Sequence, residues 1–267
     1  MNRSCDLRRG ESFSLDPALE NKQHYQHFGR QPRQVHTITD RYSMANTYLI
    51  EGERIIVVDP GSELNVCLAL SYLQDFLHRT PTAIDLIVLT HLHPDHTAGV
   101  ELLRRICNAP IAASIAAQQL AREEIQGKQA LPGITHFTEQ VLRQKTVPPA
   151  LLHLDLFPPN YADQMNTIDI WLEDVAGVPY HPNWRVIASP GHTPESICLY
   201  NPFSYELLCG DTVNTLEVGV PPFRRAANRR QLEETLRTLR SLDIYYLYPG
   251  HGRPILSKHP LENIVVE

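Results

Sequence analysis

The sequence predicts an α/β protein in which helices cover a mixed β-sheet. Residues 54–58 and 84–89 are runs rich in β-branched residues and leucine, which is typical of buried strands. Between them, residues 65–78 carry apolar side chains at helical spacing, with Asn65 as the expected N-cap. A second helix is expected over residues 97–106. This order of strand, helix, strand and helix is the one that a sheet with covering helices requires.

Composition limits the classes of partner. The chain has 267 residues, of which 42% are hydrophobic and 20% charged, as in an ordinary globular protein with a sizeable core. Its net charge is −6, with 24 basic and 30 acidic residues, which argues against a nucleic-acid-binding surface. No run has transmembrane length and no apolar segment follows the early arginines, so we expect neither a membrane partner nor a secretory signal. A small-molecule substrate is the expectation that remains.

The cysteines predict a cytoplasmic location. There are five, odd in number and scattered, and no two form a C-x-x-C pair. A reducing compartment is the simplest context for such a set. The five are Cys5, Cys67, Cys107, Cys198 and Cys209.

The chain divides into a polar arm and one domain. Residues 1–34 are polar and charged and form the expected N-terminal arm, and residues 35–267 form the domain. The domain opens with two β-segments, 35–50 and 54–58, joined at a glycine turn.

The most informative motif directly follows the strand at 84–89. Three imidazoles and one carboxylate stand within six residues at His91, His93, Asp95 and His96. Pro94 keeps His93 out of the α region, so His91 and His93 project from the same side of an extended segment. Asp95 and His96 lie beyond the turn and can reach a second point. Imidazole and carboxylate without thiolate suit zinc, and also iron or manganese.

Four further motifs follow later strands or end an early one. Asp59 ends the run at 55–58, and His192, Asp211 and His251 stand in Pro-Gly-His-Thr, Cys-Gly-Asp-Thr and Pro-Gly-His-Gly. Together with the His-rich motif, their order resembles the metallo-β-lactamase superfamily over roughly residues 35 to 256. The two Pro-Gly-His motifs are similar to those of glyoxalase II-like thioester hydrolases, and the H-x-H-x-D-H pattern is similar to that of lactonases. The resemblance implies an αββα sandwich of two mixed β-sheets flanked by helices, with an inserted lid segment.

The resemblance also implies a set of metal ligands. One metal would be bound by His91, His93 and His192, the second by Asp95, His96 and His251, with Asp211 bridging the two. Asp59 would support the site from behind. The cofactors expected are two divalent ions, with Zn²⁺ as the first choice and Fe or Mn as alternatives. Two such ions and two carboxylates give the bare site a formal charge of about +2.

This ligand set predicts hydrolysis. A binuclear centre makes hydroxide available at neutral pH and polarises a carbonyl oxygen, so the expected substrate is an ester, thioester or lactone of a small molecule. Asp95 is the expected catalytic residue, because it could carry a proton to the leaving group. Two alternatives stay open: an N-acyl homoserine lactonase, and an iron-dependent persulfide dioxygenase with a single iron.

The segment between His96 and His192 is long, and an insertion is expected around residues 112–184. Helices are expected at 114–125 and 138–145, and residues 168–172 and 185–188 are expected to return to the sheet. The apolar side chains of Leu156, Phe157 and Tyr161 could form a lid beside the metals or the contact of a homodimer, and both readings stay open.

Two departures from the family's pattern stand near the site. Glu195 lies where the family often has glycine, and it could bind a substrate amine or point to solvent. Arg224 and Arg225 form part of a basic patch that could bind a carboxylate or phosphate. A helix beginning at the N-cap Asn228 is expected over residues 229–241.

Overall fold

Two β-sheets face each other in the computed structural model, which describes residues 34–40, 45–126, 161–215, 227–262 and 264. Each sheet has six strands among these residues. The first sheet contains β1 (Val35–Thr39), β2 (Asn46–Ile50), β3 (Ile55–Val58), β4 (Ile84–Val88), β5 (Ile111–Ser114) and β6 (Ile170–Leu172). The second contains β7 (Gly177–Val178), β8 (His181–Ala188), β9 (Ile197–Asn201), β10 (Glu206–Gly210), β11 (Tyr246–Pro249) and β12 (Ile255–Leu256).

Both sheets are mixed. In the first, strands follow chain order from β1 to β6; β1, β2 and β3 pair antiparallel, and β3 to β6 pair parallel. In the second, only β10 and β11 pair parallel among the described strands, and the order runs from β12 to β7. Parallel neighbours bring their carboxyl ends to one edge. That edge holds the candidate site.

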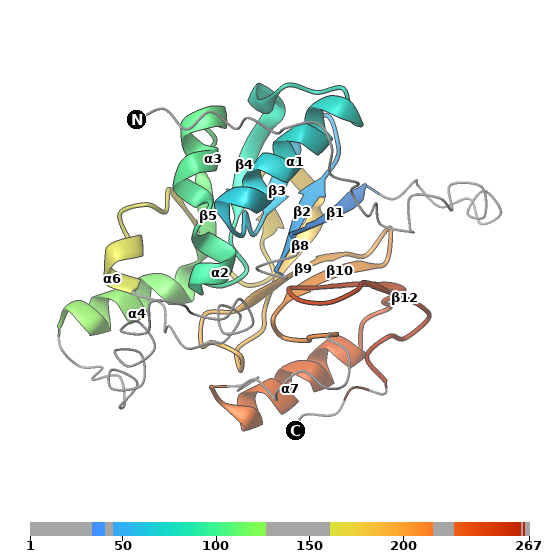
Figure 1. The fold of residues 1–267 in the computed structure, drawn as a ribbon. Coiled ribbons are helices and arrows are strands. Elements are labelled where there is room, and N and C mark those ends of the chain that lie inside the picture. The colour runs from blue at the N-terminus through green and yellow to red at the C-terminus, as the bar shows by residue number, and fades with distance from the viewer. Residues whose placement is uncertain (1–33, 41–44, 127–160, 216–226, 263, 265–267) are drawn as a thin grey trace, which may run out of the picture.

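Helices cover the outer faces of both sheets. Figure 1 shows α1 and α3 against the first sheet and α7 against the second. The helices are α1 (Glu63–Asp75), the 3₁₀ turn η2 (Pro81–Ala83), α2 (Pro94–Thr97), α3 (Val100–Cys107), α4 (Ile115–Ile125), α6 (Tyr161–Gln164) and α7 (Arg229–Arg240).

Three apolar clusters separate these layers. One packs α1, α3 and α4 on the first sheet, around Leu73, Leu103 and Ile87. A second fills the space between the sheets, around Val58 and Trp184, and a third packs Leu232, Leu236 and Leu239 of α7 on the second sheet. The fold is therefore the expected αββα sandwich, because each sheet buries one face on the other sheet and one under helices.

Several local predictions are confirmed. The helix expected at 114–125 is α4, and Ser114 caps it by accepting a hydrogen bond from the Ala116 amide at 3.2 Å. The segment expected at 168–172 contributes β6, and 185–188 ends β8. Asn228 caps α7 through its side-chain oxygen, which accepts from the Gln231 amide.

Three local predictions are wrong. Residues 35–50 contain two strands instead of one. The N-cap of α1 is Ser62, whose hydroxyl accepts a hydrogen bond from the Asn65 amide at 3.1 Å, while the buried Asn65 side chain donates to the Ala45 carbonyl. The helix expected at 97–106 is divided into α2 and α3. Pro94 begins α2 because its fixed φ suits the first turn of a helix, where no amide donor is needed.

Several predictions lie outside the described residues. They are the polar arm except for Gln34, the helix at 138–145, Leu156, Phe157, Arg224 and Arg225. Among the helices that are described, none is long and apolar enough to cross a membrane.

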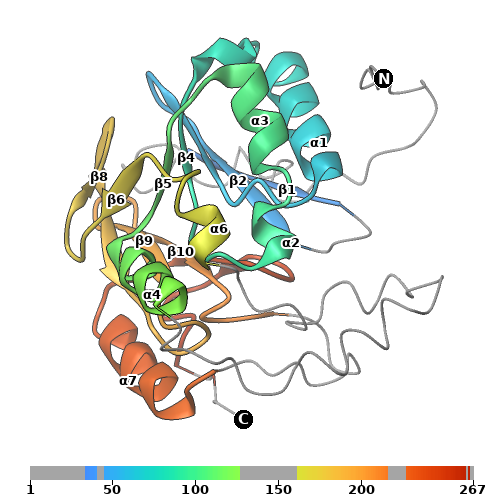
Figure 2. The ribbon, with the colours of Figure 1, turned by 90° about the vertical axis from the view of Figure 1, so that its left-hand side faces the viewer.

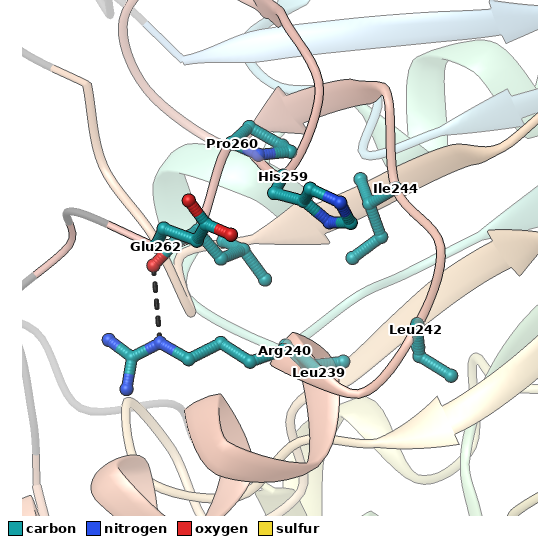
Figure 3. A pocket seen from close by; sticks show the side chains of 8 residues that line it. Leu239, Arg240, Leu242, Ile244, His259, Pro260 and Glu262 are labelled. Carbon is teal, nitrogen blue, oxygen red and sulfur yellow. Dashed lines mark hydrogen bonds between the residues drawn. The ribbon is translucent and has the colours of Figure 1, made fainter.

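A small pocket lies away from the candidate site, between the end of α7 and residues 259–262 (Figure 3). Arg240 closes one side of it by donating from Nε to the Leu261 carbonyl at 3.2 Å. Leu239, Leu242 and Ile244 line it and join the third apolar cluster. Its lining therefore attaches the segment after β12 to α7 and contains none of the predicted ligands.

Candidate metal centre

The predicted ligands meet where the two sheets adjoin. Asp59 directly follows β3, Asp211 follows β10 and His251 follows β11. Backbone hydrogen bonds join the loops across the sheets: the Ile197 amide donates to the Thr90 carbonyl at 2.9 Å, and the Asn46 amide donates to the Gly250 carbonyl at 2.7 Å. Ligand loops from both sheets are thus held against one another.

The first cluster consists of three imidazoles. His91, His93 and His192 each offer a ring nitrogen, and these atoms lie within 4.8 Å of one another. His93 Nδ1 and His192 Nε2 are 3.0 Å apart. His93 has the extended conformation that the following proline favours, with φ −65° and ψ 145°. All three side chains are buried, so their ring nitrogens point into the protein and not to bulk water.

The second cluster mixes imidazole with carboxylate. His96 Nε2 and His251 Nε2 are 3.3 Å apart, and Asp95 Oδ2 lies 3.1 Å from His251 Nε2 and 3.7 Å from His96 Nε2. Both histidines are buried, whereas the Asp95 side chain keeps 14% of its surface exposed. Asp95 is therefore the member of this cluster that faces solvent.

Asp211 lies between the two clusters. Its Oδ2 is 3.5 Å from His192 Nε2 and 3.4 Å from His251 Nε2, and its Oδ1 is 3.4 Å from His96 Nε2. One carboxylate thus faces a histidine of the first cluster and both histidines of the second, which is the position a bridging ligand would need.

Asp59 lies behind the histidines and orients two of them. Its carboxylate accepts hydrogen bonds from the Thr90 amide at 2.8 Å and the Thr90 hydroxyl at 2.7 Å, and lies 3.1 Å from His96 Nδ1. The Thr90 oxygen is 3.1 Å from His91 Nδ1. When Nδ1 of each ring donates in this direction, Nε2 is left to face the cluster. The sequence did not reveal Thr90, whose role depends on contacts across strand ends.

Two buried atoms indicate that the site suits a cation. Among the described residues, His91 Nε2 and Asp211 Oδ1 are buried without a hydrogen-bond partner. Buried polar groups are normally paired, and an unpaired imidazole nitrogen beside an unpaired carboxylate oxygen is a donor set for a divalent metal. The residues present therefore fit the metals that the family pattern implies.

The electrostatics of the clusters differ. Burial and the neighbouring imidazoles lower the pKa of His91 well below its usual range, and burial lowers the pKa of His93 to about 3. Burial also disfavours a charge on His96 and His251, but the carboxylates of Asp95 and Asp211 outweigh it. They raise the pKa of His96 well above its usual range and that of His251 to about 10.

The carboxylates respond in the opposite direction. Burial alone would raise the pKa of both Asp95 and Asp211, but the neighbouring histidines His96 and His251 outweigh it. The pKa of Asp95 falls to about 2, and that of Asp211 falls well below its usual range. Both carboxyl groups are therefore ionised at neutral pH and available to a cation.

Gly250 makes room for the Asp211 carboxylate. A Cβ at this position would overlap Asp211 Oδ1 and lie 2.9 Å from His96 Cε1. Asn46 holds the same turn by donating from its side chain to the Pro249 carbonyl at 2.9 Å. Glycine is thus required before His251 for steric reasons that sequence spacing alone does not reveal.

Glu195 neither points to solvent nor offers a free carboxylate to a substrate amine. Its side chain is 1% exposed, and it accepts hydrogen bonds from the Leu92 amide at 3.2 Å and the Tyr161 hydroxyl at 2.8 Å. Of the two alternatives that the sequence left open, the solvent-facing one is wrong, because the loop after His192 turns this side chain inward. Tyr161 is itself buried in the first apolar cluster.

Comparison with known families identifies the chain. Residues 41–251 match the family model of the metallo-beta-lactamase superfamily. The match covers well over half of the chain, and the αββα fold agrees with it. The chain belongs to the metallo-β-lactamase superfamily, as its motifs predicted, and is an enzyme of the metallo-hydrolase class.

Curated relatives share much of its length. The chain is 26% identical over 244 residues to "Probable metallo-hydrolase YflN" of Bacillus subtilis, covering 84% of this chain and 86% of that protein. It is 27% identical over 212 residues to "Probable metallo-hydrolase MJ0888" of Methanocaldococcus jannaschii, covering 78% and 87%. A "Hydroxyacylglutathione hydrolase" of Saccharophagus degradans is 27% identical over 163 residues, which cover 60% of this chain and 43% of that protein.

Solved structures share the fold. "BLEG-1 B3 metallo-beta-lactamase" superposes with a TM-score of 0.58 at 17% identity, covering 85% of this chain and 95% of the other. "TTHA1623 in a di-iron-bound form" gives a TM-score of 0.53 at 22% identity, covering 85% and 96%. At these identities the likeness is one of fold.

Proposed function

We propose that the chain hydrolyses an ester, thioester or lactone bond of a small molecule at a binuclear metal centre. The observation that carries this proposal is the position of Asp211 between two ligand clusters, within 3.5 Å of histidines of both. One carboxylate in contact with both clusters favours two ions over one, because a mononuclear site would use a single cluster.

Seven side chains would hold the ions. His91, His93 and His192 would bind the first, Asp95, His96 and His251 the second, and Asp211 would bridge them. Bound there, divalent ions would supply activated water and polarise the substrate's carbonyl oxygen. Asp59 would keep the Nε2 atoms of His91 and His96 directed into the site, through Thr90 and directly.

Asp95 is the proposed catalytic residue. It keeps 14% of its side-chain surface exposed, against 2% for the Asp211 side chain, so it is the carboxylate that a substrate's leaving group could approach. An ionised carboxylate can take a proton from the attacking water and pass that proton to a leaving group within its reach. Its neighbour His251 Nε2, at 3.1 Å from Asp95 Oδ2, orients that oxygen.

The substrate and metal are supported by relatives. The similarity to a hydroxyacylglutathione hydrolase favours a thioester over a lactone. A donor set made only of nitrogen and oxygen atoms favours zinc. Iron is a second candidate, because a structure with the same fold is described in a di-iron-bound form. The net charge of −6 supports a small-molecule substrate over a nucleic acid.

The cytoplasmic location and the homodimer are also proposals. Cys107, Cys198 and Cys209 are free thiols, which suits a reducing compartment, but Cys67 is disulfide-bonded, which does not. Thiol titration of the unfolded, unreduced chain tests the location: five reactive thiols support a reducing compartment, and three oppose it. Sedimentation of the purified chain tests the dimer.

The function is tested by metal content and a substrate panel. Protein purified without added metal should contain about two ions per chain and should hydrolyse a thioester or lactone faster than a phosphodiester. The preferred substrate decides between a thioesterase and an N-acyl homoserine lactonase. One iron per chain with oxygen uptake on a persulfide would replace the proposal with the dioxygenase alternative.

A further inference from the structure

The backbone between His91 and His93 is held by side chains that no metal would touch. The peptide N–H of Leu92 donates to Glu195 Oε1 at 3.2 Å, and the Leu92 carbonyl accepts from Gln164 Nε2 at 3.2 Å. These groups belong to the two peptide units on either side of Leu92. The two peptide groups that set the directions of the His91 and His93 side chains are therefore held by hydrogen bonds from residues that are not among the predicted metal ligands.

The two side chains come from different parts of the chain. Gln164 belongs to α6, and Glu195 stands three residues after His192, in the loop that carries the third histidine of the first cluster. Tyr161, one turn before Gln164 in α6, donates its hydroxyl to Glu195 Oε2 at 2.8 Å. Glu195 thus joins the loop of His192 to the loop of His91 and His93, and α6 supports both contacts.

Helix α6, which provides two of these side chains, is itself held in place by α4. The Ala162 amide at the start of α6 donates to Glu124 Oε2 of α4 at 2.9 Å, and α6 lies beside α4 (Figure 2). Tyr161 is packed in the first apolar cluster with Leu92, and Met165 packs against the same cluster. Burial raises the pKa of Tyr161, so its hydroxyl stays protonated and donates. A rigid neighbour of this kind can hold a ligand loop in one geometry.

We propose that Glu195, Tyr161 and Gln164 are positioning residues for the first cluster, which fix His91, His93 and His192 in the arrangement that binds a metal. The inference rests on the proposed binuclear function and deepens it. It predicts an effect confined to one cluster, since among the described residues none of the three forms a hydrogen bond with Asp95, His96 or His251.

The test uses metal affinity and not turnover. The full chain is stripped of metal by a chelator and titrated with Co²⁺, whose visible absorption reports ligation. His251→Ala provides a background in which the first cluster titrates, and His192→Ala one in which the second does. Tyr161→Phe and Gln164→Ala should each weaken Co²⁺ binding about tenfold in the first background, at the lower end of what lost outer partners cost, and leave the second unchanged.

Variants of Glu195 separate geometry from charge. Glu195→Ala loses both hydrogen bonds and should weaken the first cluster by about 10–100-fold. Glu195→Gln should retain affinity within about threefold, because its carbonyl can accept from Leu92 and its amide can donate to the Tyr161 oxygen. If Glu195→Gln binds as weakly as Glu195→Ala, the carboxylate charge matters and the positioning inference is wrong.

Tyr72→Phe is the matched control. Tyr72 is a buried tyrosine of the same apolar cluster, and its hydroxyl lies 3.0 Å from His36 Nδ1, away from the ligands. The positioning role predicts weaker Co²⁺ binding for Tyr161→Phe than for Tyr72→Phe at equal thermal stability. Equal affinities in the two variants, or equal weakening of both clusters, would overturn it. If the wild-type chain binds no second Co²⁺, the proposed binuclear function is wrong. The titration in the His251→Ala background still tests the positioning role in that case.

Discussion

The two ligand clusters lie side by side but differ in charge. His91, His93 and His192 form a cluster of imidazoles, and burial keeps His91 and His93 neutral. In the other cluster, Asp95 and Asp211 raise the pKa of both histidines, to about 10 for His251. His91 and His93 are therefore available to a cation at neutral pH, whereas His96 and His251 hold protons that a cation must displace. Histidines in neighbouring clusters can thus differ in whether a proton must leave before a cation binds.

The largest effect is expected where the clusters share a ligand. Asp211→Ala removes the carboxylate that lies within 3.5 Å of histidines from both clusters. Turnover on the preferred substrate should fall by at least about 100-fold, since even outer partners of metal ligands cost about 10–100-fold. Steady-state kinetics with metal analysis measures this. Wild-type turnover in the variant would contradict the bridging role, and unchanged far-UV circular dichroism is the control for folding.

Variants that lose one histidine should lose metal at one cluster and keep it at the other. His192→Ala and His251→Ala each remove one imidazole from one cluster, so each should lower the metal content from about two to about one per chain. Affinity at the damaged cluster should fall at least about 100-fold, and the other cluster should keep its metal. Metal analysis after equilibrium dialysis checks this. Loss of both metals in both variants would show that the clusters do not bind independently.

The pH dependence of metal binding should differ between the clusters. In the His192→Ala background, Co²⁺ must displace protons from His96 and His251, so affinity should rise with pH up to about 10, by at most about 100-fold per pH unit for two protons. In the His251→Ala background affinity should rise less steeply with pH, because the pKa of His93 is lowered to about 3 and that of His91 is also lowered, so these two ligands hold no proton to displace. Co²⁺ titrations from pH 6.5 to 9 measure how steeply affinity changes with pH in each background. Equal steepness in the two backgrounds would contradict the difference in charge between the clusters.

The stability of the metal-free chain should fall as the pH rises, whereas the metal affinity of the second cluster should increase. The pKa of His251 is raised from its ordinary 6.5 to about 10, so its charged form stabilises the fold. That contribution is complete below pH 6.5 and is lost as the pH rises through about 10. Thermal unfolding of chelator-treated protein should show declining stability in this window, and His251→Ala should flatten the decline. A metal-free chain whose stability increases over the same range would contradict the assignment.

The smallest effect is expected behind the site. Asp59→Asn replaces the acceptor that holds Thr90 and His96 by an amide that can still accept from Thr90 but competes as a donor toward His96 Nδ1. Affinity of the second cluster should fall by about tenfold and that of the first by less, since His91 is reached only through Thr90. Co²⁺ titration in the single-cluster backgrounds measures both values. A larger loss of affinity at the first cluster than at the second would contradict the direct support of His96 by Asp59.

The sequence by itself determined the family, the layers and the set of residues that meet at the strand ends. Short apolar runs predicted buried strands, and the order of Asp and His motifs after them led to the superfamily, because these signals are local and each motif carries its own turn. Asn65 shows the limit of local signals: it has the residue type of an N-cap, but Ser62 takes that position and Asn65 turns inward to the Ala45 carbonyl.

The tertiary structure alone decided how the site is divided and supported. His93 meets His192 across 99 residues and His96 meets His251 across 155, so the separation into a neutral and a charged cluster depends on how the sheets pair. Glu195 appeared in the sequence as a departure from the family pattern that could bind a substrate amine or point to solvent. Its inward direction comes from the Leu92 amide and the Tyr161 hydroxyl, which lie 103 and 34 residues away. Contacts over such separations form only when the fold brings strand ends together, and residue spacing contains no information about them.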